Sequence, residues 1–379
     1  MTRFRVSLIV FTVLALVLAA CGDTAPSSGA SQAASQPAGE SQEAPESQAA
    51  EPSEPPTTGA GRLATVQSRG NLICGVNGSL PGFSFLDESG ETAGFDADFC
   101  RAVAAAVLGD SDAVEFRNLT ADQRGPALQT GEVDVLIRNT TWTVSRDTAW
   151  GLFAPTTFFD GQAIMVHAAV GATTLEDLAG ASICVQTGTT TELNLADAFR
   201  DIDFEPVPFA DIDPTYQAYT EERCDAVTSD RSQLVAQRTG FENPDDHVIL
   251  DAVLSKEPLG PVAPLGDDAW FNVIKWVVYA TIEAEELGID STNVADTASS
   301  SDNPVVQRFL GVTPEGADPF ESGLGLDADW VVDVISSVGN YAEIYDRNLG
   351  PSTPFALERG LNSLWNSEEG GLLYAPPYR

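Results

Sequence analysis

The chain has 379 residues, of which 43% are hydrophobic, and a formal charge of −37 at pH 7. This strong negative charge argues against binding to nucleic acid or to anionic lipid, because both repel an acidic surface. Without a leader and a linker, roughly 315 residues remain, which is more than one hydrophobic core usually organises. We therefore expect two lobes, each with its own core.

The N-terminal residues predict a lipoprotein signal peptide at 1–20. Arg3 and Arg5 precede an apolar run that is too short to cross a membrane comfortably as a helix. The run ends in the tetrapeptide LAAC, which resembles the bacterial lipobox, so Cys21 is the expected site of lipidation. An ordinary secretory signal with a chance cysteine is the alternative.

Residues 21–61 are expected to form a disordered tether that starts at the lipidated Cys21. After the cysteine they consist mainly of Ser, Ala, Gln, Glu, Pro and Gly and include no aromatic residue. Such a composition buries too little surface to fold, and its Pro and Glu content keeps it extended. The folded domain should begin near Leu63.

Four further cysteines are Cys74, Cys100, Cys184 and Cys224. An even number in an exported protein suggests disulfides, and three pairings are possible. We favour Cys74–Cys100 and Cys184–Cys224, since each bond would then lie within one lobe. Metal binding is the weaker alternative because no CxxC pair exists, and we expect neither a metal nor a cofactor.

The folded part begins with strands and helices in alternation. Apolar runs predict strands, and apolar residues at helical spacing predict helices. The expected order is a strand at 72–76, a helix around 99–107, a strand at 114–116, a helix at 120–129 and a strand at 133–137. Alternation of this kind implies a largely parallel sheet covered on both faces.

The same alternation then restarts. Strands are expected at 163–166, 182–185, 204–207 and 225–227, and helices at 192–199, 216–222 and 232–238. A long amphipathic helix at 267–287 should leave this second unit, and the tail should hold helices at about 328–347 and 354–365. Two such sheets facing each other predict a ligand site in the cleft between them, beyond the carboxyl ends of the strands.

Polar segments follow two of these strands directly. Residues 138–147, RNTTWTVSRD, include Arg146, whose planar guanidinium suits a carboxylate. Residues 186–192, QTGTTTE, start a helix in which Thr189 and Glu192 have the spacing of a capping box. Unpaired N–H groups at such a helix start favour an anion, and Gly188 allows close approach. A solvated loop and simple capping are the respective alternatives.

A third strand ends near Asp230, whose carboxylate can neutralise an ammonium group, although Asp also caps helices. An arginine, a helix N-terminus and an aspartate together would bind both charges of a zwitterion. Burying a charge is costly unless it is paired, so such a site needs all three groups. No G-x-S-x-G, HExxH or P-loop motif occurs in the sequence.

Several segments resemble the family 3 solute-binding proteins, which serve polar amino acids. The segment GFDADF at 94–99 resembles the signature of that family. Longer segments resemble its general L-amino-acid-binding (Aap/Bzt type) members: CGVN at 74–77, RNTTWT at 138–143, CVQTGTTTELNLAD at 184–197, NPDDH at 243–247, SKEPLGP at 255–261 and YAPP at 374–377. The resemblance runs from about residue 63 to residue 379.

The resemblance implies a periplasmic-binding-protein-like type II α/β fold, with two lobes joined by a two-strand hinge and extra C-terminal helices. It places the crossovers near 159–161 and 253–258. Lobe 1 would then comprise 62–160 plus 258–379, and lobe 2 would comprise 161–257. The lobes of such proteins close around the ligand by a hinge motion, and the permease recognises the closed form.

The resemblance also assigns roles to residues. Arg146 matches the arginine that grips the ligand α-carboxylate, Thr189 matches its partner from the other lobe, and Asp230 matches the carboxylate that holds the α-ammonium. Thr141 and Asn139 match neighbouring polar contacts.

Four more residues complete the expected ligand-binding set. Leu80 falls where relatives that bind histidine or lysine carry a stacking aromatic residue, and an aliphatic residue there fits a broad pocket. Arg138 either prefers acidic or amide side chains or is held by an internal carboxylate. Gly188 and Thr190 belong to the same helix start as Thr189.

The expected function is that of an extracytoplasmic amino-acid-binding lipoprotein of an ABC importer, and not that of an enzyme. Its expected partners are an L-amino acid, the permease subunits and, through the lipid anchor, the membrane, with no nucleic acid and a monomeric state. A sensor lipoprotein would share the binding chemistry. An enzyme resembling the periplasmic cyclohexadienyl dehydratases would need a general acid in the cleft, where Glu192 is committed to capping.

Overall fold

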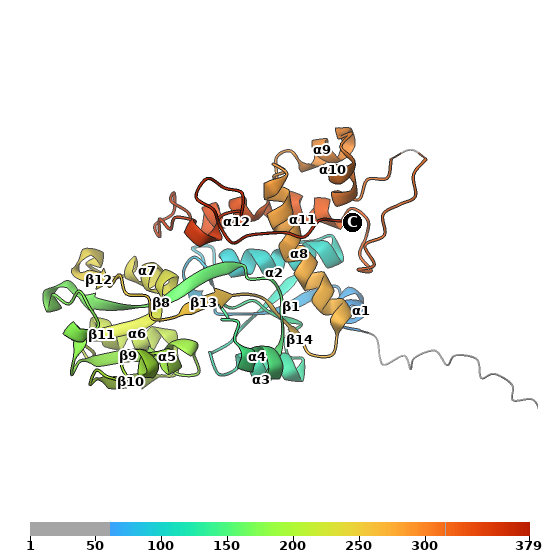
Figure 1. Ribbon diagram of the computed structural model, residues 1–379. Helices are drawn as coiled ribbons and strands as arrows, with labels where there is room; N and C mark the ends of the chain where they lie inside the picture. Colours follow the sequence, from blue (N-terminus) through green and yellow to red (C-terminus); the bar gives the residue numbers. More distant parts are fainter. Residues whose placement is uncertain (1–60, 315) are drawn as a thin grey trace, which may run out of the picture. The chain divides into compact units, whose positions relative to one another are not determined.

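The computed structural model describes residues 61–314 and 316–379 (Figure 1). The predicted signal peptide, Cys21 and the predicted tether up to residue 60 lie outside the described residues. Within the described part, none of the helices combines the length and the apolar character that crossing a bilayer requires.

The first lobe is built on a five-stranded sheet with the strand order β5-β1-β6-β14-β7. Its strands are β1 (Leu72–Val76), β5 (Val114–Asn118), β6 (Val135–Leu136), β7 (Gly151–Phe153) and β14 (Val262–Pro264). β1 pairs in parallel with β5 and β6, as expected, whereas β14 runs antiparallel to both β6 and β7. A small antiparallel sheet follows β1 and consists of β2 (Ser79–Leu80), β3 (Ser84–Leu86) and β4 (Thr92–Ala93).

The second lobe repeats this plan with the strand order β10-β9-β11-β8-β12. Its strands are β8 (Phe158–His167), β9 (Ser182–Gln186), β10 (Glu205–Phe209), β11 (Ala226–Asp230) and β12 (His247–Ile249). β9 pairs in parallel with β10 and β11, and β8 runs antiparallel to β11 and β12. Parallel strands at the start of each sheet therefore point their carboxyl ends in one direction.

Two strands pass between the lobes. β8 enters the second lobe, and β13 (Lys256–Leu259) returns and pairs antiparallel with the start of β8, so that Glu257 lies opposite Asp160. The lobe limits expected from the sequence, after residues 160 and 257, fall inside these two crossover strands.

Helices cover the faces of both sheets (Figure 1). In the first lobe they are α1 (Arg62–Arg69), α2 (Phe95–Leu108), α3 (Arg124–Thr130), α4 (Val144–Ala149), α8 (Asp268–Glu286), α9 (Val294–Ser300), α10 (Pro304–Phe309), α11 (Trp330–Val338) and α12 (Tyr341–Asn348). In the second lobe they are α5 (Thr190–Ala198), α6 (Ile212–Thr220) and α7 (Arg231–Arg238). Short 3-10 turns occur at Ala168–Val170, Glu176–Leu178, Pro244–Asp246 and Gly360–Asn362.

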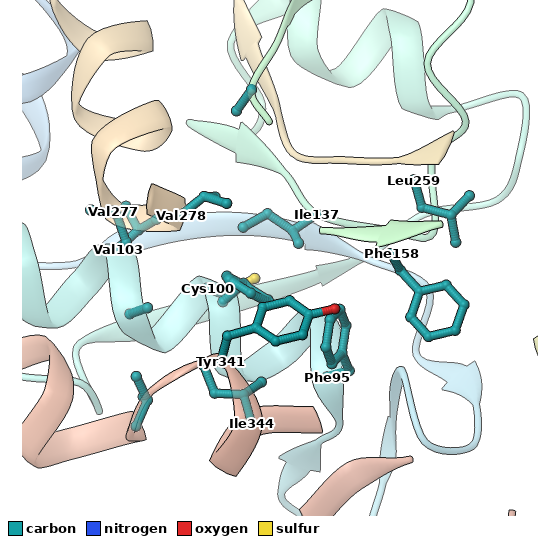
Figure 2. Close-up of a cluster of buried hydrophobic side chains, with 14 of the residues drawn as sticks. Phe95, Cys100, Val103, Ile137, Phe158, Leu259, Val277, Val278, Tyr341 and Ile344 are labelled. Atoms are coloured by element: carbon teal, nitrogen blue, oxygen red, sulfur yellow. The ribbon is translucent and has the colours of Figure 1, made fainter. Parts of the chain in front are cut away.

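The C-terminal helices complete the core of the first lobe. Figure 2 shows Phe95 and Val103 of α2, Val277 of α8 and Tyr341 and Ile344 of α12 gathered in one cluster, and each is at most 1% exposed. Burying a large apolar side chain contributes about 1.5–3 kcal/mol. The extra helices are therefore a structural part of this lobe.

The tail differs from the sequence expectation in two places. The helix expected at 328–347 is divided into α11 and α12, because Gly339 has a φ of 80° and Asn340 starts a new helix with a capping box to Glu343. The helix expected at 354–365 is wrong, since Ala356 and Gly360 both have a φ of 47°, which leaves the helical region. The short helices α9 and α10, of seven and six residues, were not predicted.

Part of the tail contacts the first crossover strand. The side-chain amide of Asn362 accepts from the backbone N–H of Phe159 at 2.6 Å and donates to the carbonyl oxygen of Phe159 at 3.2 Å. This side chain satisfies both backbone groups of one β8 residue, as a neighbouring strand would.

Both disulfides favoured from the sequence are present. Cys74–Cys100 joins β1 to α2, and Cys184–Cys224 joins β9 to the residues just before β11. All four cysteines are at most 1% exposed, and each bond lies within a single lobe.

Removing the second disulfide should lower the stability of the domain. The bonded cysteines are 40 residues apart, and closing a loop of that length removes about 3–4 kcal/mol of chain entropy from the unfolded state. We expect the variant with both Cys184→Ala and Cys224→Ala to lose about that free energy of unfolding in urea denaturation. An unchanged urea midpoint would contradict the expectation.

Candidate ligand-binding site

A polar cavity lies between the lobes, where β6, β9 and β11 end. The space free of protein atoms there measures about 300 Å³, including part that is open to solvent. The residues that line it are Arg124, Arg138, Asn139, Thr141, Arg146, Gln186, Thr189, Thr190, Thr191, Ser229, Asp230 and Gln233. Strand ends from both sheets therefore meet at one site, as the alternation of elements predicts.

Arg146 is held rigidly by its helix and its neighbours. It lies in α4, whose first N–H groups are capped by Thr143, and its side chain is 7% exposed. Nη1 donates to the carbonyl of Thr141 at 3.1 Å, and the guanidinium lies 4.9 Å from the ring centroid of Trp150. Burial lowers the pKa of Arg146, while the carboxylates of Glu257 and Asp230 act in the opposite direction.

The N-terminus of α5 contributes from the second lobe. Thr189 caps the helix by accepting from the N–H of Glu192 at 3.1 Å, and the Glu192 carboxylate accepts from the N–H of Gly188 at 3.0 Å. Glu192 is therefore engaged in capping, as expected. Gly188 has a φ of 71°, and a Cβ there would lie 1.9 Å from Oδ1 of Asp122 in the first lobe, so only glycine fits this close approach.

Asp230 ends β11 and is 5% exposed. Its side chain does not cap α7, and among residues 61–314 and 316–379 no hydrogen bond or ion pair reaches its carboxylate. Burial raises the pKa of Asp230 well above its usual value, with further contributions from the carboxylates of Asp160 and Glu257. A cation placed beside Asp230 would restore the charged form.

Further contacts join the lobes around the cavity. The Thr141 and Thr190 hydroxyls lie 3.3 Å apart, and the Asn139 amide donates to Gln233 at 3.4 Å. Asn139 has a φ of 32°, and its N–H donates to the buried carboxylate of Asp96 at 2.7 Å. These contacts fix the polar loop that follows β6.

Two carboxylates on the crossover strands border the site and were missed by sequence reasoning. Glu257 is 1% exposed and accepts from Thr190 Oγ1 and Asn194 Nδ2, each at 2.8 Å. The carboxylate of Asp160 accepts from the N–H and the hydroxyl of Ser232. Their position at the site follows from the antiparallel pairing of β8 and β13, which local sequence patterns do not reveal.

Arg124 and Arg138 bring two more guanidinium groups to the cavity. Arg124, at the first residue of α3, donates to the Gly188 carbonyl at 3.1 Å, and Arg146 donates to the same oxygen at 3.5 Å. The Nε of Arg138 donates to the Leu119 carbonyl at 2.7 Å. Burial, followed by the two other arginines, lowers the pKa of Arg124 well below its usual value.

Seven of the nine residues expected from the sequence line this cavity, whereas Leu80 and Gly188 do not. Leu80 is fully buried in the core of the first lobe and does not line the cavity. Among the lining residues that were missed, Thr191 and Ser229 directly neighbour expected ones, and Gln186 lies two residues before Gly188. Gln233 lies one helical turn after Asp230, a spacing that could have identified it.

A comparison with known protein families is consistent with a binding site between two lobes. Residues 72–351 match the model of the bacterial extracellular solute-binding proteins, family 3. The chain belongs to this family. Within the described chain of this family 3 protein, no cluster of His, Cys, Asp and Glu side chains could hold a metal ion.

Relatives match most of the length of this family 3 protein. The general L-amino acid-binding periplasmic protein AapJ of Rhizobium johnstonii is 49% identical over 320 residues, which cover 84% of this chain and 92% of AapJ. The glutamate/glutamine/aspartate/asparagine-binding protein BztA of Rhodobacter capsulatus is 45% identical, with 84% and 94% covered. A Brucella ovis periplasmic binding protein with glutathione bound has a TM-score of 0.80 at 48% identity, with 85% and 100% covered.

The hinge carboxylate Asp160 should make stability depend on pH. Burial raises its pKa to about 6 from 3.8, so its contribution favours folding below the unfolded value and is lost as the pH rises through the folded value. We expect Asp160→Asn to gain stability relative to the wild type between about pH 4 and pH 7, by on the order of 2–3 kcal/mol. Urea denaturation at several pH values measures this difference, and parallel pH profiles for the two proteins would exclude the assignment.

Proposed function

We propose that this protein captures L-amino acids outside the cytoplasm and delivers them to an ABC importer. The observation that carries the proposal is that Arg146 of the first lobe, Asp230 of the second lobe and the N-terminus of α5 line one cavity. An α-amino acid presents a carboxylate and an ammonium group a short distance apart, and both need partners when they leave water. The cavity supplies one partner for each charge.

The α-carboxylate has a guanidinium and helix amides as its partners in this proposal. Arg146 offers nitrogens of a planar fork, which suits two carboxylate oxygens. The N-terminus of α5 adds partial positive charge from the other lobe. A ligand held in this way joins the two lobes and favours their closed arrangement.

The α-ammonium has the Asp230 carboxylate as its partner. Asp230 has no other hydrogen-bond partner among the described residues, and its pKa is raised by burial and neighbouring carboxylates. Binding of a cation would therefore be coupled to proton release from Asp230. Thr141, Asn139, Thr189 and Thr190 would supply polar contacts around the ligand.

The relatives support the class of ligand. AapJ is named for binding L-amino acids in general, and BztA for binding glutamate, glutamine, aspartate and asparagine. We carry amino-acid binding and the partnership with a permease over to this chain as part of the proposal, with a monomeric state and no catalytic activity. Incubation with arogenate or prephenate should leave both compounds unchanged.

The proposed location is outside the cytoplasmic membrane, with a lipid anchor on Cys21. The apolar run before that cysteine and the tetrapeptide LAAC support removal of residues 1–20. One acyl chain alone would hold the protein weakly, so two or three chains are expected. The mass of the mature N-terminal peptide tests this anchor, and an unmodified Cys21 would refute it.

Replacing Arg146 should abolish amino-acid binding and preserve the fold. Leaving a desolvated carboxylate without its partner costs about 3–5 kcal/mol, so Arg146→Ala should weaken binding by at least about 100-fold in calorimetry. Thermal unfolding checks that the variant is folded. Near wild-type affinity for every amino acid that the wild type binds would refute the role of Arg146.

A second variant tests the contact with the ligand ammonium group separately from the contact with its carboxylate. Asp230→Asn should weaken amino acids much more than the matching keto acids, because only the amino acids carry an ammonium group. Equal losses for both classes would contradict the role of Asp230.

A further inference from the structure

The described residues that line the cavity carry more positive than negative charge, and the buried carboxylates of Glu257 and Asp160 lie close to this lining. Arg124, Arg138 and Arg146 line it, whereas Asp230 is the one carboxylate among the described lining residues. In the proposed function, the ligand α-carboxylate pairs with Arg146 and the α-ammonium pairs with Asp230. The charges of Arg124 and Arg138 remain to be explained.

The protein itself engages Arg124. Its Nε donates to the Ala121 carbonyl at 2.9 Å, and its Nη2 donates to the Gly188 carbonyl at 3.1 Å. Its guanidinium also lies 5.5 Å from the ring centroid of Trp150. One terminal nitrogen of Arg124 is therefore committed to a contact between the lobes.

Arg138 is engaged much less. It is 4% exposed, and its Nε donates to the Leu119 carbonyl at 2.7 Å. Its two terminal nitrogens have no hydrogen-bonded acceptor in the part of the chain that the structure describes. Asp96 and Asp211 attract the guanidinium, yet neither forms an ion pair with it among these residues. A buried guanidinium whose fork lacks a partner is suited to a carboxylate.

The position of Arg138 fits a side-chain contact. A second cavity adjoins the first and shares Arg138 and Gln186 with it. Arg146, Thr189 and Thr190 instead border a third cavity, which Arg138 does not line. Arg138 and Arg146 therefore border different adjoining spaces, which places Arg138 away from the end that would hold the α-carboxylate.

We propose that Arg138 binds a second carboxylate, carried by the side chain of the ligand, and that the preferred ligands are anionic amino acids. Such a ligand has two carboxylates and one ammonium group, which matches Arg138 and Arg146 on one side and Asp230 on the other. This inference rests on the proposed function. It makes Arg138 a specificity-determining residue, while Arg146 and Asp230 serve every amino acid.

Glutamate and glutamine test the inference because they differ in one side-chain group of nearly equal size. The wild type should bind glutamate about tenfold or more tightly than glutamine, since a charge-assisted fork contact exceeds a neutral one. Arg138→Gln should weaken glutamate by at least about tenfold and change glutamine by less than about threefold. Calorimetry of the full chain measures both affinities.

A matched control removes the same charge elsewhere in the same lobe. Arg117 lies in β5, its side chain is 49% exposed, and it does not line the cavity. Arg117→Gln should leave the ratio of the glutamate and glutamine affinities unchanged. If Arg138→Gln fails to fold, Arg138→Lys replaces it, because lysine keeps the charge and loses the planar fork. Its ratio should lie between that of the wild type and unity.

An unchanged glutamate-to-glutamine ratio in the folded Arg138 variant would overturn the inference and leave the proposed function intact. A wild-type protein that binds glutamine as tightly as glutamate would also overturn it. The proposed function fails separately, if the wild type binds no amino acid at all.

Discussion

The arrangement of the site depends on one carbonyl oxygen, that of Gly188, which accepts from Arg124 and Arg146 across the two lobes. A buried guanidinium group whose donors lack partners costs free energy. The shared oxygen accepts one hydrogen bond from each of two guanidinium groups and so joins the two lobes at this point. It can do so because residue 188 has no Cβ, adopts a positive φ and starts the helix whose N-terminus faces the cavity.

Much of this site could be predicted from local sequence. Arg146, Thr189 and Asp230 each follow an apolar strand, and strand ends in α/β sheets meet at one edge. The roles of Arg124, Asp160 and Glu257 could not be predicted, because each depends on a contact between segments far apart in the chain. Asp160 and Glu257 become neighbours only through the antiparallel pairing of β8 and β13.

The fold was predictable where apolar residues recur with a strong period. It was less predictable where the backbone conformation of single residues determines where a helix ends. The alternating strands and helices of both lobes follow from their apolar patterns. The tail does not, since positive φ angles at Ala356 and Gly360 end a helix that composition alone would allow. Leu80 shows the same limit for side chains, because an apolar residue near a site suits the core and the pocket equally well, and here it lies in the core.

The two disulfides have a consequence for motion. Each joins residues of the same lobe, so no sulfur bridge spans the cleft, and the described lobes are tied covalently through β8 and β13 alone. The disulfides can therefore stabilise each lobe against unfolding without adding a covalent restraint between the lobes. The covalent bonds that stabilise each lobe are therefore separate from the two strands that connect the lobes.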